Sequence, residues 1–382
     1  MFSNRASIPS ALQSFRLEDR MLCYNHFIPR LYNWCLSLGF TPGKIMPSRA
    51  FCSDESQGVP IIMIAKHFGA FPFNHGRVGG IVSIDRHAPH AEHGKDLLLL
   101  QASHVGYDTE RATFGQYRRL HTEAEGHTGN CGKIGHIIAP YKAQFDYACE
   151  NIRLLHYAGR PAVLIDNCLL SRTLKEGLSP IADNLIQDAV NRILPQPLAA
   201  RSTGNIYAAA NKLITRLGDA AWPREGSVPI GKHLSAEDFY FRREWGDADP
   251  KLNQLERNLI DPMPWIVTSK HPLLTAACAN TQAEFDRTYR SLVQEPAMRG
   301  KNLLFVAGLN IDISPETRDD FPLTKFVPWA AYQQLANGKT EILEQDAVFD
   351  RLNAQSSTNP VQLNLEQSIE TVAKQREVEV RL

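Results

Sequence analysis

The sequence of 382 residues has no net charge and no long hydrophobic run, and we expect no secretory leader. It has 41 Lys and Arg against 41 Asp and Glu, so no general electrostatic attraction draws it to nucleic acid or anionic lipid. Its apolar runs, such as Leu97–Leu100, fall far short of the roughly 18–20 residues that span a bilayer. Its first residues do not follow the charged-then-apolar pattern of a signal peptide. We therefore expect neither nucleic acid nor membrane as a partner, and we expect a cytoplasmic location.

A disulfide framework is also not indicated. The chain has 7 cysteines, an odd number, which predicts free thiols in a reducing compartment. Most of them, such as Cys35 and Cys278, lie among apolar residues, where a free thiol acts as a small buried hydrophobe. Cys52 and Cys131 instead lie in polar loops, Phe-Cys-Ser-Asp-Glu-Ser and Thr-Gly-Asn-Cys-Gly-Lys. Because a thiol has no packing role in such loops, these two are candidates for chemistry.

Strand and helix patterns alternate along the chain, which predicts an α/β sheet with helices on both faces. The clearest buried strand is Asp96–His104, an apolar run that ends in polar residues. Other strands are expected at 44–52, 303–307 and 326–332. Helices are expected at 11–40 (interrupted at Pro29), 57–67, 141–157, 180–194, 205–217 and 281–294, and 218–262 is expected to be irregular.

Cys52, His104 and Cys131 form a candidate set of metal ligands. His104 ends the clearest strand, and open α/β sheets carry their chemistry beyond the carboxyl ends of strands. In an extended segment, Asp54 would face the same site as Cys52. Two thiolates and one imidazole suit a tetrahedral Zn²⁺ that keeps its fourth position for water. The three residues are widely separated, and there is no C-x-x-C or H-E-x-x-H pattern, so spacing alone also leaves structural roles open.

Several segments in a fixed order resemble one known family. The segments are Phe51-Cys-Ser-Asp-Glu, Gly76-Arg-Val-Gly-Gly, Ser103-His-Val-Gly-Tyr-Asp and Asn130-Cys-Gly, followed by Leu303-Leu-Phe-Val-Ala-Gly-Leu-Asn-Ile-Asp and Phe326-Val-Pro. Together they resemble the low-CO2-inducible protein B/C family, which is related to beta-class carbonic anhydrases and partly described as theta-class. The resemblance covers residues 20–150 well and 300–340 less closely.

The resemblance implies a beta-carbonic-anhydrase-like fold, in which an open, mostly parallel sheet is flanked by helices. It implies one such domain over 1–350, with an insertion at about 160–300, and we expect a peripheral helical tail at 351–382. Beta-class relatives are dimers with the site near the subunit interface, so the resemblance also implies a homodimer.

For the site, the resemblance implies that Cys52, His104 and Cys131 bind zinc. Asp54 falls on an aspartate that either hydrogen-bonds the zinc-bound water or occupies the metal. An arginine must hold this carboxylate, because an unpaired buried carboxylate would be drawn to the cation. Beta-class enzymes place the arginine two residues after the aspartate, where this sequence has Ser56. The partner must therefore come from elsewhere, with Arg77 as first choice and Arg86 as second.

The implied function is reversible hydration of CO2 to bicarbonate by zinc-bound hydroxide. His75 and His87 are candidates for a proton shuttle, although lone histidines are more often structural. Two other functions stay open: a catalytically silent relative that acts as a binding partner in a CO2-concentrating system, and a zinc hydrolase. Candidates for an apolar wall around CO2 are Phe51, Phe71, Phe73 and Val105.

Overall fold

The computed structural model describes residues 5–84, 95–118, 127–170, 176–187, 204–245, 254–314 and 323–374. The chain divides into two compact units. Unit 1 comprises Ser10–Lys133 and Ala277–Leu382, and unit 2 comprises Phe2–Pro9 and Ile134–Ala276. The chain passes from one unit to the other within three helices, α1 (Ile8–Gln13), α4 (Gly132–Asn151) and α10 (Pro272–Gln294). The single domain over 1–350, with its insertion and its tail at 351–382, stays a prediction.

Unit 1 is built on an eight-stranded sheet with the order β1-β17-β16-β6-β2-β3, in which β18 also pairs with β17 and β7 with β6. The pairs β16–β6, β6–β2 and β2–β3 are parallel, whereas β17 pairs antiparallel with β16, β1 and β18, and β7 pairs antiparallel with β6. The strands are β1 (Leu22–Cys23), β2 (Ile45–Ala50), β3 (Phe73–Asn74), β6 (Asp96–Asp108), β7 (Thr113–Phe114), β16 (Leu303–Ile313), β17 (Leu323–Gln334) and β18 (Thr340–Leu343). This confirms the predicted α/β fold, with a mostly parallel sheet flanked by helices.

The two central strands, β6 and β16, are buried along almost their whole length. Parallel strands that are covered on both faces read as continuous apolar runs, and Leu97–Leu100 and Leu303–Ala307 are such runs. Both strands extend further than predicted, to Asp108 and Ile313. The ladder between β6 and β16 continues beyond the apolar runs. The polar side chains there find partners inside the protein, Ser103 with Asn280 and Asp312 with His104.

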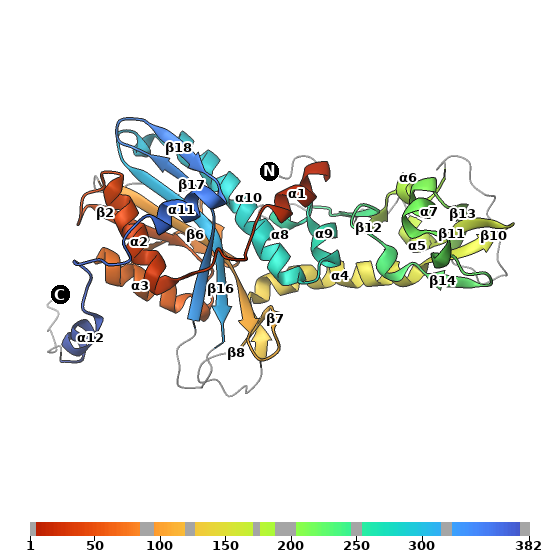
Figure 1. The fold of residues 1–382 in the computed structure, drawn as a ribbon, viewed down its shortest axis with the longest axis horizontal. Coiled ribbons are helices and arrows are strands. Elements are labelled where there is room, and N and C mark those ends of the chain that lie inside the picture. Colours follow the sequence, from red (N-terminus) through yellow and green to blue (C-terminus); the bar gives the residue numbers. More distant parts are fainter. Residues whose placement is uncertain are drawn as a thin grey trace. The chain divides into compact units, whose positions relative to one another are not determined.

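Helices cover both faces of this sheet (Figure 1). On one face, α2 (Tyr24–Ser37), α3 (Gly58–Phe68) and α11 (Gln345–Asn353) pack into a core with the even-numbered side chains of β6. Phe27, Leu31 and Trp34 of α2 are fully buried there, which contributes about 1.5–3 kcal/mol for each side chain. On the other face, Phe285 of α10 stacks on Phe305 of β16.

The prediction of one helix over 11–40, interrupted at Pro29, is wrong. It is two helices, α1 (Ile8–Gln13) and α2, and α2 runs through Pro29 without interruption. Proline inside a helix removes one backbone donor and its ring clashes with the carbonyl of residue i−4, at a cost of about 3 kcal/mol, and the buried apolar face of α2 outweighs this cost. The remaining elements of unit 1 are β4 (Gly76–Arg77), β5 (Ile81–Val82), β8 (Gln116–Arg118), β9 (His127–Gly129), α12 (Leu365–Ala373) and the 3-10 turns η2 (Glu55–Gln57) and η7 (Pro296–Met298). None of the described helices is long and apolar enough to cross a membrane.

Unit 2 contains a four-stranded antiparallel sheet of order β13-β11-β10-β14 and a two-stranded ladder of β12 with β15. Its strands are β10 (Ile152–Tyr157), β11 (Arg160–Asp166), β12 (Gly177–Pro180), β13 (Gly204–Ala208), β14 (Ser227–Pro229) and β15 (Phe239–Arg242). Its helices and turns are η1 (Arg5–Ser7), α5 (Asn167–Leu170), α6 (Ala182–Leu185), α7 (Asn211–Leu217), η5 (Asp219–Ala221), η6 (Gly231–His233), α8 (Gln254–Leu259) and α9 (Met263–Thr268).

Three expectations about unit 2 are wrong. The helix expected over 141–157 ends at Asn151, and 152–157 forms β10 in a hairpin with β11. The helix expected over 205–217 begins only at Asn211, because 204–208 pairs with β11 as β13. The region 218–262, expected to be irregular, contains β14, β15 and α8. In the first two cases pairing with β11 overrides the local helical pattern, and in the third β14 pairs with β10 and β15 with β12. Of the helix expected over 180–194, the described residues contain only α6.

Candidate metal centre

The three predicted ligands come together in unit 1. Their ligand atoms all lie within 4.8 Å of one another, and all three residues are buried. The Sγ atoms of Cys52 and Cys131 are 3.9 Å apart. Among the described residues this is the one group of three His, Cys, Asp or Glu side chains with such spacing and full burial.

Parallel pairing explains how residues so far apart in the sequence converge. Strands β2 and β6 are neighbours, with Ala50 opposite Gln101, so Cys52 lies beyond the carboxyl end of β2, beside the second half of β6. His104 lies in that half of β6. Cys131 directly precedes α4, and its neighbour Asn130 accepts a hydrogen bond from the Gly106 backbone at 3.0 Å. This backbone contact holds the third ligand against the strand that carries the second.

Asp312 of β16 fixes the orientation of His104. Its Oδ2 atom lies 2.8 Å from His104 Nδ1, and both side chains are completely buried. Ser56 and Gln57 also donate hydrogen bonds to this carboxylate. The other ring nitrogen, Nε2, is buried and has no hydrogen-bond partner among the described residues. A histidine held in this way at Nδ1 presents Nε2 as a ligand atom.

The charges inside the cluster are strongly linked. Burial lowers the pKa of His104, but the hydrogen bond with Asp312 and the closeness of the two cysteine sulfurs outweigh it and raise the pKa well above its usual value. The hydrogen bond with Cys131 lowers the pKa of the Cys52 thiol, and the same bond together with burial raises the pKa of Cys131. The backbone N–H of Gly79 also donates to Cys52 Sγ, at 3.2 Å. Cys52 is therefore the sulfur most easily held as a thiolate.

Asp54 lies at the start of η2, and hydrogen bonds join it to residues that neighbour the three ligands. Its Oδ1 atom accepts from the Ser56 N–H at 3.1 Å and from Asn130 Nδ2 at 3.5 Å. Arg77 Nε donates to Ser83 Oγ at 2.9 Å. The pairing of Asp54 with Arg77 stays a prediction. The alternative Arg86 lies outside the described residues, as does the candidate shuttle His87.

The candidates for an apolar wall are spread over different environments. Phe51 is buried in the core beneath α2. Val105 directly follows His104 on β6, so the two side chains point to opposite faces of the sheet. Phe71 is 73% exposed and Phe73 is 52% exposed. Phe71 and Phe73 are thus open to solvent in the single chain, whereas Phe51 and Val105 are buried. His75 is half-buried in the short connection between β3 and β4.

The sequence reasoning missed the polar residues behind the ligands. Asn310 and Asp312 alternate in the otherwise apolar strand β16, so both face the same side of the sheet. Asn310 accepts a hydrogen bond from Tyr24 and donates one to Gln57 Oε1. This alternation of two polar residues inside a buried strand was the available signal.

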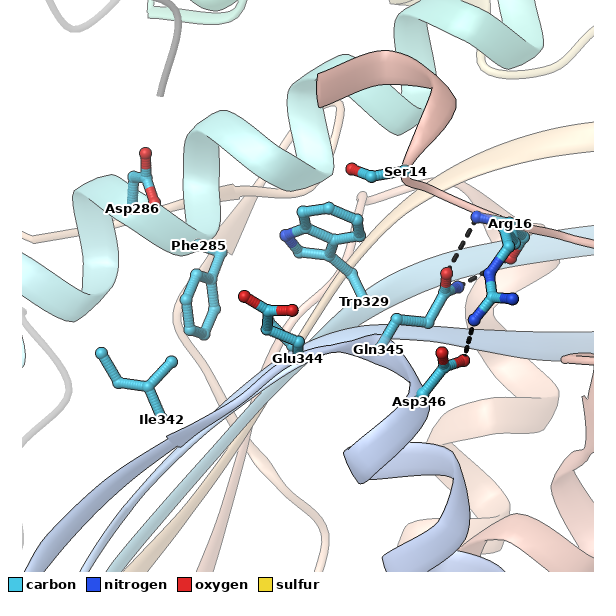
Figure 2. A pocket seen from close by; sticks show the side chains of 10 residues that line it. Ser14, Arg16, Phe285, Asp286, Trp329, Ile342, Glu344, Gln345 and Asp346 are labelled. Atoms are coloured by element: carbon cyan, nitrogen blue, oxygen red, sulfur yellow. Dashed lines mark hydrogen bonds and ion pairs between the residues drawn. The ribbon is translucent and has the colours of Figure 1, made fainter. Parts of the chain in front are cut away.

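A cavity of about 450 Å³ lies elsewhere in unit 1 (Figure 2). Trp329, Phe285 and Ile342 form its apolar part. Figure 2 also shows Arg16 in an ion pair with Asp346, while the Arg16 backbone bonds to Gln345. None of the three candidate ligands lines this cavity, so it is separate from the metal centre.

Comparison with known proteins identifies the fold. No protein-family model matches the sequence, and no curated protein matches it. The solved structure of PtLCIB4, a homolog of the limiting CO2-inducible protein LCIB, matches with a TM-score of 0.51 and 12% identity, over 88% of this chain and 99% of that chain. LCIB itself matches with a TM-score of 0.45 and 12% identity, over 86% of this chain and 96% of that chain. The likeness to PtLCIB4 shows a shared fold, and the resemblance seen in the sequence is confirmed at that level.

Proposed function

We propose that this chain belongs to the low-CO2-inducible protein B/C family and is a zinc-dependent carbonic anhydrase, which interconverts CO2 and bicarbonate. The observation that carries the proposal is the buried group of Cys52, His104 and Cys131. The fold shared with PtLCIB4 supports it.

The donor set fits zinc. Catalytic zinc sites use three protein ligands and keep a fourth position open, and sulfur donors disfavour the hard cations Mg²⁺ and Ca²⁺. His104 Nε2 is a buried nitrogen without a hydrogen-bond partner among the described residues, which is the state expected of a ligand atom. Cys52, His104 and Cys131 would hold the ion. When bound, zinc lowers the pKa of a coordinated water to about 7 and so supplies a nucleophile at neutral pH.

The surrounding residues would orient and shield this group. Asp312 keeps a proton on His104 Nδ1 and so leaves Nε2 as the donor atom. The fully buried Ser56 and Gln57 hold Asp312 in turn and exclude water from it. We propose that Arg77 pairs with Asp54 and keeps its carboxylate away from the ligands, because an unpaired carboxylate near a cation is drawn to it.

We also propose a homodimer in a reducing, cytoplasmic compartment. All seven cysteines are free, including the three exposed or half-buried ones, Cys23, Cys149 and Cys168. Free exposed thiols are typical of a reducing environment.

The decisive experiment compares Cys52→Ala with the wild type. We expect one zinc per chain and CO2 hydration in the wild type, and loss of both in the variant, because a thiolate ligand is gone. Elemental analysis measures the metal, and stopped-flow kinetics under reducing conditions measures hydration. Cys23→Ala removes an exposed thiol outside the cluster and is the matched control, with circular dichroism to verify folding.

Full hydration by a verified metal-free Cys52→Ala protein would refute the proposal. A wild type that binds zinc but hydrates no CO2 would favour the silent relative that acts through partners.

A further inference from the structure

We propose that Asn280 is a positioning residue for the metal centre, although α10 contributes no ligand. Asn280 would hold residues 76–82, here called the site hairpin, so that the Gly79 N–H stays directed at Cys52 Sγ. The inference rests on the proposed zinc site and assigns a role in it to a part of the chain that the ligand set does not include.

The site hairpin must be held in place for this hydrogen bond to exist. It consists of β4 and β5 with the tip Val78-Gly79-Gly80. Gly79 and Gly80 have φ angles of +83° and +77°, which side chains rarely tolerate. A Cβ atom on Gly80 would lie 2.2 Å from the Ala102 carbonyl oxygen. The tip therefore contacts the backbone of β6 two residues before His104.

Asn280 connects this tip to β6. Its amide nitrogen donates to the Gly79 carbonyl at 3.0 Å and to Ser103 Oγ at 2.8 Å. Gly79 is the residue whose N–H reaches Cys52, and Ser103 directly precedes His104. Asn280 is completely buried, so water does not compete for these bonds. The Asn280 side chain thus links Gly79, which donates to Cys52, with Ser103, which precedes His104 in the chain.

Glu284, one helical turn after Asn280, makes a second contact with the same hairpin. The buried Glu284 Oε2 accepts the Val82 N–H at 2.7 Å. Arg287 pairs with Glu284 and also donates to the Val82 carbonyl. The hairpin is therefore held at its tip and in its second strand by one helix. Such a support keeps a backbone donor directed at a sulfur more rigidly than a free loop would.

The link to function is the hydrogen bond on the ligand sulfur. A backbone N–H that donates to a thiolate withdraws charge from it and fixes its direction toward a metal. Outer partners of metal ligands typically affect metal affinity or activity by about 10–100-fold. Loss of the Asn280 contacts should therefore change the metal-bound sulfur itself, in addition to any change in stability.

The test uses Asn280→Ala with Zn²⁺ and Co²⁺ as probes. We expect zinc affinity, measured by competition with a chelator, to fall about 10–100-fold. At saturating Co²⁺ we expect the sulfur-to-cobalt charge-transfer absorption to shift, because Sγ loses its hydrogen bond. Thr288→Val is the matched control: Thr288 is buried on the same helix, and its hydroxyl has no partner among the described residues. It should leave both readouts unchanged.

Ser103→Ala keeps the test decisive if Asn280→Ala does not fold. It removes one of the two Asn280 contacts with a minimal change in volume, and we expect smaller changes in the same direction. Zinc affinity and a cobalt spectrum equal to those of the wild type in the folded variants would overturn the positioning role and leave the proposed function intact. A wild type that binds no metal through the three ligands would instead refute the proposed function, and with it this inference.

Discussion

At the scale of single residues, two glycines with nearly the same backbone conformation have different tasks. Gly69 ends α3 with a φ of +73°, and a Cβ atom there would meet nothing within 4 Å. Gly80 has a φ of +77°, but its Cβ atom would collide with the Ala102 carbonyl. Gly69 therefore serves only the turn, whereas Gly80 also permits the site hairpin to lie against β6.

This difference predicts unequal effects of alanine at the two positions. Gly69→Ala should cost about 1–2 kcal/mol of the free energy of unfolding, the penalty for a side chain in the left-handed region. Gly80→Ala should cost more, because the strain is joined by a backbone collision, and it should weaken zinc binding as the hairpin moves from Cys52. Urea denaturation and metal titration measure both effects. Equal losses of stability in the two variants would show that the hairpin does not need this close approach.

The residues of the site differ in how far the sequence could indicate them. Cys52 and Cys131 are conspicuous because they are polar-loop thiols, and His104 because it ends an apolar run. Asp312 is marked only by its alternation with Asn310 in a buried strand, and Asn280 has no local signal. Each acts through a partner on a distant part of the chain, and only the pairing of β16 with β6 and the packing of α10 bring them into place.

At the scale of elements, the buried strands were predictable and their limits were not. Leu97–Leu100 indicates a strand covered on both faces, because the apolar run is short and ends in polar residues. Ile152–Tyr157 continues the helical spacing of apolar residues that runs from Phe145 through Cys149, and its antiparallel pairing with β11 makes it a strand. The spacing of apolar residues shows which face of a segment is buried. It does not show which other part of the chain packs against or pairs with that segment.

A buried histidine in helix α3 should make the stability of the protein depend on pH. His67 lies in its last turn, is 5% exposed and contacts Asn359 from the C-terminal segment. Burial, and then the charge of Lys66, lower the pKa of His67 to about 4. An unfolded histidine has a pKa of about 6.5. Between these values the unfolded state binds the proton more strongly, so stability is present above about pH 6.5 and is lost as the pH falls toward 4.

His67→Gln should remove this dependence. Between about pH 7 and pH 5, the wild type should lose about 1–2 kcal/mol more of its free energy of unfolding than the variant. His26→Gln replaces an exposed histidine on α2 and should behave like the wild type. Denaturant titrations at the two pH values give the comparison, and parallel losses in all three proteins would contradict the buried neutral state of His67.

At the scale of the whole molecule, the site depends on a long strand pairing that a list of motifs does not contain. β6 and β16 pair in parallel over eleven residues, from Leu303 opposite Leu97 to Ile313 opposite Tyr107. This register sets Asp312 beside the strand segment that carries His104. A shift by one residue would turn the polar face of β16 toward the other side of the sheet. The order of motifs indicated the fold, but the Asp312–His104 pair is a consequence of the register alone.

The exposed apolar residues near the site hairpin suggest where the proposed homodimer forms. Phe71, Phe73 and Val78 are 73%, 52% and 49% exposed, and Val78 adjoins the Gly79 that bonds Cys52. If a second copy covers these side chains, Phe71→Ser combined with Phe73→Ser should cost about 3 kcal/mol of association free energy, which raises the dimer Kd roughly 100-fold. Leu323→Ser, at a 65% exposed residue that begins β17, is the control and should leave the Kd unchanged. Sedimentation equilibrium over a range of concentrations measures it. A monomeric wild type at micromolar concentration would refute the dimer, and an unaltered Kd in the double variant would exclude these phenylalanines from its interface.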